Sequence, residues 1–165
     1  MSRSGGISHK VVKLMKMITG IYSTNVDDKG RILLPARMRQ ALQSQELVVL
    51  PGLDENHLML MTPSYFEDRF SQAVLSSDTA MFDSGKRSLI RRLISPAVYI
   101  EQDASGRINI PQNLREKYSI LTKSEVVLVG TGYAIEVWNS EIYNKAMEEE
   151  SESISSLADR LRSTM

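Results

Sequence analysis

Four cationic side chains fall within eleven residues near the start of the chain: Lys29, Arg31, Arg37 and Arg39. Lys29 and Arg31 flank a single glycine, Gly30, and the two later arginines follow an apolar run that ends in proline. Ammonium and guanidinium groups at this density suit phosphates, and an arginine can also donate two hydrogen bonds to the edge of a guanine. The segment therefore predicts a site for an anionic partner, with nucleic acid as the leading case.

The same residue types also allow a purely structural interpretation. Asp27 and Arg31 are four residues apart across a predicted tight turn, where a carboxylate–guanidinium pair would hold the turn closed. An exposed pair of this kind contributes only about 0–1 kcal/mol. Gly30 would supply the positive φ that such a turn needs. We therefore keep two hypotheses: Asp27 and Gly30 form a turn clasp, and Arg31 either completes that clasp or contacts an anion.

The motif around these residues occurs twice. Residues 27–35 and residues 103–111 both read Asp-x-x-Gly-Arg, then an alternating apolar run, then proline, at an offset of 76 positions. Arg39 and Arg115 follow at the same offset. With small insertions at loop-like places, the similarity extends over roughly fifty residues of each copy, so the chain is a tandem duplication.

The second copy carries a weaker form of the cationic group. Asp103, Gly106 and Arg107 occupy the clasp and contact positions of the motif. Ser105 stands where the first copy has its turn lysine, and Asn113 stands where it has the first helix arginine. We therefore predict that both copies contact the anionic partner and that the first copy binds it more strongly.

The pattern around each motif predicts an α+β, β-rich fold. Residues 21–26 and 31–34 are β-prone and flank the first turn, so we predict a β-hairpin with the motif at its tip. Pro35 suits the first position of a short helix at 35–42. Periodicity then predicts strands at 47–50 and 57–61 and helices at 62–75 and 86–94, the last with one basic face. The second copy repeats this order, with strands at 97–102, 107–110, 125–129 and 133–138, a short helix at 111–118 and a helix from 140.

Composition shifts divide the chain into five parts. Residues 1–16 match nothing in the second copy and are predicted to be a flexible or weakly helical extension. The two copies span 17–75 and 96–147, and a linker with the basic helix, 76–95, joins them. An acidic, Ser-rich tail at 148–165 is predicted to form a frayed or context-dependent helix. Copies of this size bury only modest cores alone, so we expect them to pack together or to oligomerise.

The net charge of zero conceals a polarity along the chain. Residues 1–40 carry eight Lys/Arg and two Asp, a net +6, whereas residues 140–165 carry three Lys/Arg and six acids, a net −3. A basic front end suits an anionic partner. An ordinary solvated surface would give the same count, and on charge alone we favour that interpretation.

Enzymatic chemistry is not expected from this sequence. The two histidines, His9 and His57, do not recur in the second copy, and there is no Gly-rich phosphate loop. Without cysteine there are no disulfides or thiolate ligands. We predict no catalytic residue, no metal site and no cofactor. A cytoplasmic location fits the absence of cysteine. No apolar run approaches the ~20 residues of a membrane span, so we expect no membrane partner.

The opening of the first copy resembles that of a known family. Residues 17–22, Met-Ile-Thr-Gly-Ile-Tyr, followed by the Asp-x-x-Gly-Arg motif and Pro35, are similar to the start of the bacterial MraZ transcriptional regulators. The second half resembles the same family at Arg91-Arg92-Leu93, Ile110-Pro111 and Glu136-Val137-Trp138. The resemblance covers residues 17–138 and extends more loosely to 147. A duplicated motif with matching flanks is a far more specific signal than either copy alone.

The resemblance implies both a fold and a function. Each half would be an AbrB/SpoVT-like swapped-hairpin unit, and the two would pair into a barrel-like core with flanking helices. MraZ proteins are sequence-specific DNA-binding regulators that act on tandem promoter repeats upstream of the division and cell-wall gene cluster. They assemble into ring-shaped homo-oligomers, here expected as an octamer or larger. The DNA-contacting arginine of the family falls on Arg31, beside Lys29, with Arg107 as its counterpart. The resemblance also implies a nucleoid-associated protein with no small-molecule substrate.

Two departures from the family pattern leave alternatives open. Residues 1–16 precede the usual start at Met17, either as an upstream start-codon assignment or as a real extension. Asn109 stands where an apolar residue is usual, which bears on the orientation of the second motif strand. The competing class is an oligomeric scaffold or antitoxin-like interaction module of the same fold, without nucleic acid. A salt-dependent shift on promoter DNA would separate the two classes.

Overall fold

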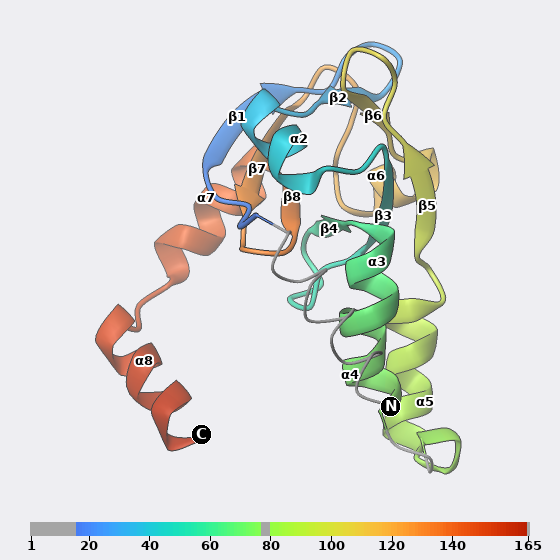
Figure 1. Cartoon of the computed structure of the whole chain (residues 1–165). Helices are drawn as coiled ribbons and strands as arrows, with labels where there is room; N and C mark the ends of the chain where they lie inside the picture. The colour runs from blue at the N-terminus through green and yellow to red at the C-terminus, as the bar shows by residue number, and fades with distance from the viewer. Residues whose placement is uncertain (1–15, 77–79, 165) are drawn as a thin grey trace.

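The computed structural model describes residues 16–76 and 80–164 (Figure 1), so the predicted extension lies almost entirely outside the described residues. The strands are β1 (Ile21–Asn25), β2 (Arg31–Leu33), β3 (Glu46–Pro51), β4 (Leu58–Met61), β5 (Val98–Glu101), β6 (Arg107–Asn109), β7 (Glu125–Gly130) and β8 (Ile135–Asn139). The α-helices are α2 (Ala36–Leu42), α3 (Pro63–Tyr65), α4 (Ser71–Leu75), α5 (Ser84–Leu89), α6 (Gln112–Lys117), α7 (Ser140–Glu149) and α8 (Ile154–Ser163). Between them lie the π-helical segments η1 (Phe66–Phe70) and η3 (Ile90–Ile94) and a short 3-10 turn, η2 (Ala80–Phe82).

The described strands form two antiparallel sheets. The larger sheet has six strands in the order β1-β7-β8-β4-β3-β5, and the smaller sheet pairs β2 with β6. Helices flank the larger sheet and continue beyond it toward the C-terminus (Figure 1). The predicted α+β, β-rich class with flanking helices is therefore confirmed.

In the described part of the chain, the strands on either side of each motif do not pair with each other. β1 pairs with β7, with Ile21 opposite Val129, and β5 pairs with β3. β2 pairs with β6 around the facing residues Ile32 and Ile108. The predicted hairpins are therefore wrong, although each motif does form a turn. A turn signal is local, whereas the pairing partner depends on which strand faces can be buried together.

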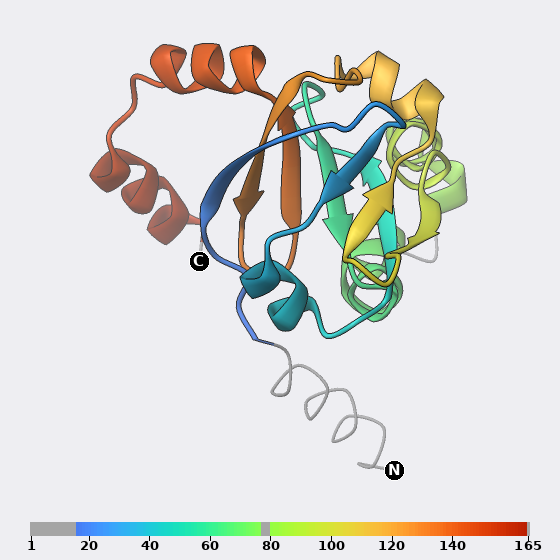
Figure 2. The ribbon, with the colours of Figure 1, turned by 90° about the horizontal axis from the view of Figure 1, so that it is seen from above.

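The expected barrel-like closure is also corrected. β1 and β5 are the two edges of the larger sheet, so that sheet is open across residues 16–76 and 80–164. β2 and β6 pair only with each other and lie over one end of it (Figures 1 and 2). The core is therefore enclosed between two sheets and not by one continuous ladder. The swapped-hairpin description of each half stays a prediction.

One apolar core is shared by both copies. Ile32 of β2 and Ile108 of β6 are fully buried in the same cluster, which also includes Val49 of β3. The preceding residue, Val48, points to the other face of the sheet and packs in a second cluster with Phe66 of the helical layer. Burial on both faces explains why β3 is a continuous apolar run in the sequence. The expectation that the two copies pack together is confirmed.

Two helical arms cover the second cluster. One arm is α3-η1-α4 and the other is α5-η3, and they run side by side away from the sheets (Figure 1). The first arm begins where Thr62 Oγ1 accepts a hydrogen bond from the Tyr65 amide at 3.1 Å. The second begins where Asp83 accepts one from the Lys86 amide at 3.1 Å. Both arms extend in the direction opposite to the two motif turns (Figure 1).

The C-terminal helices leave the body of the fold. α7 follows β8 directly, and α8 is set apart from both sheets (Figures 1 and 2). Every described residue of α8 is exposed, including Ile154 at 86% and Leu161 at 64%. The predicted tail helix is thus present. Of the helices in residues 16–76 and 80–164, none combines the length and apolarity that a bilayer crossing requires.

Candidate nucleic-acid interface

The first motif turn is organised by the carboxylate of Asp27. This carboxylate accepts hydrogen bonds from the backbone amides of Lys29 at 2.9 Å and Arg31 at 2.8 Å, and from Arg31 Nε at 2.8 Å. Gly30 closes the turn with a φ of +83°, a conformation that a side chain would resist. Because Asp27 holds only the Nε of Arg31, the two terminal nitrogens of that guanidinium are available to a ligand.

The second motif turn has the same backbone and lacks the side-chain pair. Asp103 accepts hydrogen bonds from the amides of Ser105 at 2.8 Å and Arg107 at 2.9 Å. Gly106 has a φ of +85°. Across the described ranges, the guanidinium of Arg107 forms no ion pair. The orientation of the arginine side chain is therefore fixed by the turn carboxylate in the first copy only.

Both turn carboxyls are stabilised as anions. The hydrogen bond from the Arg31 amide is the main cause that holds the pKa of Asp27 below its usual value. The Arg107 amide does the same for the pKa of Asp103, and the charge of Arg31 lowers it further.

Each turn is supported by an arginine of the other copy. A Cβ placed on Gly30 would stand 2.6 Å from Nη2 of Arg115, and a Cβ placed on Gly106 would stand 2.5 Å from Cδ and Nε of Arg39. In each arginine the Nε donates, at 3.0 Å, to the carbonyl of the residue that follows the motif strand of its own copy. The short helices α2 and α6 therefore each support the turn of the opposite copy.

The smaller sheet has one buried face and one solvent-facing side. Its central pair of isoleucines is fully buried, so the residues on either side alternate outward. There Arg31 stands opposite Asn109, and Leu33 stands opposite Arg107. We call the surface formed by these four residues the outer face of β2–β6. It brings the motif arginines of both copies onto one side of a two-stranded ribbon.

Asn109 is the residue of this face that sequence reasoning missed. The sequence marks it only as a departure from the family pattern, whereas the structure places it exposed and directly opposite Arg31. Its amide can both donate and accept, which suits the edge of an adenine. Pairing the two motif strands antiparallel about Ile32 and Ile108 would have predicted this position.

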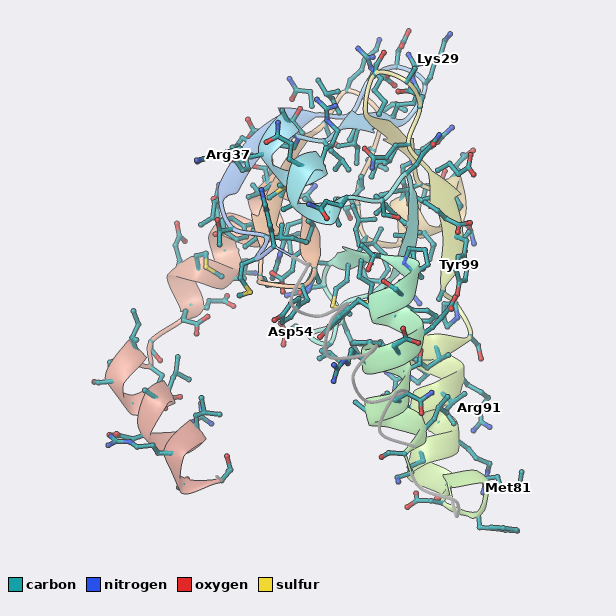
Figure 3. All side chains as sticks on the ribbon, in the orientation of Figure 1. Lys29, Arg37, Asp54, Met81, Arg91 and Tyr99 are labelled. Atoms are coloured by element: carbon teal, nitrogen blue, oxygen red, sulfur yellow. The ribbon has the colours of Figure 1, made fainter. Side chains whose placement is uncertain are left out.

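The predicted cations do not form one patch. Figure 3 shows Lys29 at the tip of the first turn and Arg37 well away from it, on α2. Arg39 of the same helix packs on the second turn, whereas Arg37, two residues earlier, is exposed on another side of the helix. The structure thus brings Lys29 together with Arg31, places Arg39 against the second turn, and leaves Arg37 apart from the first turn.

A buried histidine links the two copies elsewhere in the fold. His57 is 1% exposed, stacks on Trp138 at a ring-centroid distance of 4.3 Å, and has its Nε2 3.3 Å from a carboxylate oxygen of Glu136. Trp138 Nε1 donates to the other Glu136 oxygen at 2.9 Å. The interaction with His57 is the main cause that holds the pKa of Glu136 below its usual value. A search for a second-copy histidine could not find this cluster, because the partners of His57 are a tryptophan and a glutamate.

The outer face of β2–β6 has the form of a nucleic-acid contact. The major groove of B-DNA admits a two-stranded ribbon, and arginine and asparagine are the side chains that read base edges there. The exposed Lys29 and Arg37 can meet phosphates on either side. Within residues 16–76 and 80–164, no group of His, Asp and Glu side chains is placed to hold a metal ion.

Comparison with known proteins finds relatives over most of the chain. The family described as "MraZ protein, putative antitoxin-like" matches residues 17–84 and 93–164. A protein of Treponema denticola named "Transcriptional regulator MraZ" is 35% identical over 144 residues, which cover 87% of this chain and 96% of the relative. A protein of the same name from Treponema pallidum (strain Nichols) is 38% identical over 131 residues, which cover 79% of this chain and 85% of the relative. These names support a regulatory role, and the matches confirm the resemblance seen in the motifs. The chain belongs to the MraZ family.

Proposed function

We propose that this protein is a sequence-specific, DNA-binding transcriptional regulator that contacts promoter DNA through the outer face of β2–β6 and the two motif turns. One observation carries the proposal. Arg31 and Arg107 lie on the same side of a two-stranded ribbon, and Asp27 and Asp103 fix the backbone at their positions. The regulator names of the relatives support the same conclusion.

The contacts divide into base readers and phosphate binders. Arg31 presents its terminal nitrogens to a guanine, and a good bidentate pair of this kind discriminates against the wrong base by about 1–3 kcal/mol. Arg107 does the same from the second copy. Lys29 and Arg37 bind phosphates and set the position of the ribbon on the duplex. Arg39 adds its charge from beside the second turn, although its Nε is already bonded to a carbonyl.

The target is an array of tandem repeats upstream of the division and cell-wall gene cluster, and the protein binds it as a ring-shaped homo-oligomer, an octamer or larger. The family resemblance supports both points. The small number of base-reading arginines on each chain also supports the homo-oligomer. A ribbon that offers two arginines binds weakly alone and gains affinity when several copies bind the same DNA. The protein acts in the cytoplasm, associated with the nucleoid.

The proposal is tested by fluorescence-anisotropy titration of labelled promoter DNA against a scrambled duplex of the same composition. Specific binding should exceed non-specific binding at least ~10³-fold at physiological salt. Arg31→Ala should lower the specific affinity, and Arg69→Ala is the matched control. Arg69 is an exposed arginine on the helical arm that points away from the turns. A stable oligomer that treats both duplexes alike would favour the scaffold or antitoxin-like alternative.

A further inference from the structure

A cavity of about 630 Å³ lies between the turn after β3, the α5-η3 arm and the end of α6. Its volume falls within the roughly 300–1,000 Å³ of small-molecule sites. Leu53, Leu89 and Tyr118 contribute to its apolar lining, and Arg91 and Lys117 contribute charge. None of these residues has a part in the DNA contacts proposed above, so the cavity needs its own explanation.

The charges around the cavity favour an anion. Arg92 is paired with Glu55, and this pair joins two of the cavity walls. Arg91 and Lys117 have no carboxylate partner in the described parts of the chain. Once the paired charges cancel, two positive charges are left over the cavity. Unpaired cations beside a low-dielectric wall raise the local concentration of anions.

A nearly buried phenol adds a directional group. Tyr118 is 6% exposed and lines the cavity, yet its hydroxyl has no hydrogen-bond partner within residues 16–76 and 80–164. Within the described residues the hydroxyl is not among the fully buried atoms that lack a partner, so it is open to the cavity, where a ligand can accept its hydrogen bond. Burial raises the pKa of this phenol and the charge of Glu55 raises it further, so the hydroxyl, neutral at physiological pH in any case, remains a donor.

The remaining walls are apolar and incompletely covered. Leu53 is 66% exposed and Leu89 is 42% exposed, and they line the cavity with Pro51 and Pro96. Covering large aliphatic side chains with an apolar group is favourable, because it removes their surface from water. The cavity therefore combines an apolar wall with a cationic group and one neutral donor.

We infer that this cavity binds a small organic anion, an apolar body that carries one carboxylate or phosphate group. Arg91 and Lys117 pair with the anionic group, and the Tyr118 hydroxyl donates a hydrogen bond to it. Leu53 and Leu89 cover the apolar body. The site is independent of the DNA interface, so failure of either proposal leaves the other standing.

The test is a fluorescence titration of the full-length protein with 1-anilinonaphthalene-8-sulfonate, an apolar ring system with one anionic group. Binding should saturate at one site per chain. Excess phenyl phosphate or phenylacetate should displace the probe, and whichever does so at the lower concentration identifies the preferred anion. Inorganic phosphate carries only the anionic group, and benzyl alcohol has the apolar ring without a charge. Each should need an at least ~10-fold higher concentration to displace the probe.

Variants locate the probe. The double variant Arg91→Gln/Lys117→Gln should weaken probe binding at least ~10-fold, and Tyr118→Phe should weaken it ~3–10-fold without changing the melting temperature. The control Arg69→Gln/Lys145→Gln removes the same charge from other helices and should bind as the unmodified protein does. Saturable binding that is equal in both double variants, or binding that never saturates, would overturn the inference. If one of these variants melts at a lower temperature, Leu53→Ser takes its place. Leu53 is exposed, so the substitution should leave the fold intact, and the affinity for the probe should fall.

Discussion

Arg39 lies across Gly106, and Arg115 lies in the same way across Gly30. Each arginine comes from the short helix that follows its own motif, yet it supports the turn of the other copy. The duplication is thus reciprocal in space as well as in sequence. Arg39 and Arg115 therefore both have a structural role in supporting a turn. The DNA contact of Arg39 is a separate point and stays a prediction.

Replacing either turn glycine should disturb both stability and DNA binding. Gly30→Ala and Gly106→Ala each add a Cβ that meets an arginine within 2.6 Å, at a φ that disfavours side chains. We expect a loss of about 1–3 kcal/mol in the free energy of unfolding, measured by urea titration.

Gly85→Ala is the control for this measurement, because Gly85 lies in α5 with an ordinary φ. There the added Cβ would meet only the flexible Asp83 carboxylate, at 3.2 Å, so alanine should cost far less than at either turn glycine. Equal stability in Gly30→Ala and in the unmodified protein would show that Arg115 does not hold that turn.

Replacing the buried Arg115 should affect stability, whereas replacing the exposed Arg37 should affect DNA binding. Arg115 is 8% exposed and donates to two backbone carbonyls, so Arg115→Ala should cost about 2–4 kcal/mol of stability by leaving those carbonyls unpaired. Arg37 is exposed, and Arg37→Ala should change stability by less than about 0.5 kcal/mol. Its effect should instead appear as a salt slope of DNA binding that is shallower by about 0.9. An unchanged salt slope would remove Arg37 from the interface.

The order of elements could be predicted from the sequence because its signals are local. Thr62 and Pro63 begin a helix in the structure as they do in the sequence pattern, since a cap and a proline act on their own neighbours. The pairing of β1 with β7 could not be predicted in this way. It depends on which strands can bury apolar faces against each other, and the turn between two strands does not decide that.

The candidate site shows the same division. Arg31, Gly30 and Asp27 lie within one turn, and the sequence spacing alone gives their contacts. Arg37 is near the first turn in sequence, but α2 carries it away from Lys29 in space, and Arg39 of the same helix packs on the second turn. The asymmetry expected between the copies from Lys29 and Arg37 stays a prediction, and the Asp27 pair with Arg31 gives a further reason for it.

Acid should remove the contribution of the Glu136 cluster. Its interaction with His57 lowers the pKa of Glu136, so its stabilisation is fully present above the unfolded value, about 4.3, and is lost as pH falls through the folded value. Glu136→Gln should therefore melt below the unmodified protein at pH 7, and the two should converge once the pH falls below the folded pKa of Glu136. Calorimetric scans across this range measure the difference. Glu148→Gln, an exposed carboxyl on α7, should run parallel to the unmodified protein throughout.

Arg31 and Arg107 should contribute unequally to DNA binding. Asp27 holds the Arg31 guanidinium before DNA arrives, whereas Arg107 must be ordered on binding, which costs about 0.5–1.5 kcal/mol. Arg31→Ala should lower affinity ~5–150-fold, and Arg107→Ala should lower it less. Asp27→Asn keeps an acceptor for the turn amides and weakens the arginine pair, so it should remove most of this difference in anisotropy titrations. If both arginine variants lose the same affinity, side-chain preorganisation is not the reason for the asymmetry.

Helical phasing of the DNA repeats should control affinity. A ring carries identical copies of the β2–β6 face at fixed intervals, and repeats spaced near one helical turn, about 10 base pairs, present the same groove to successive copies. Each added contact is then intramolecular, and avidity rises by ~10²–10⁴ where the geometry permits. We expect affinity to climb steeply from one repeat to three, to fall when ~5 base pairs are inserted between repeats, and to recover with ~10.

Anisotropy titrations on this duplex series at two salt concentrations measure both affinity and the number of phosphates contacted, since each adds about 0.9 to the salt slope. Equal binding to one repeat and to three, with no response to the half-turn insertion, would mean that each protomer reads DNA alone.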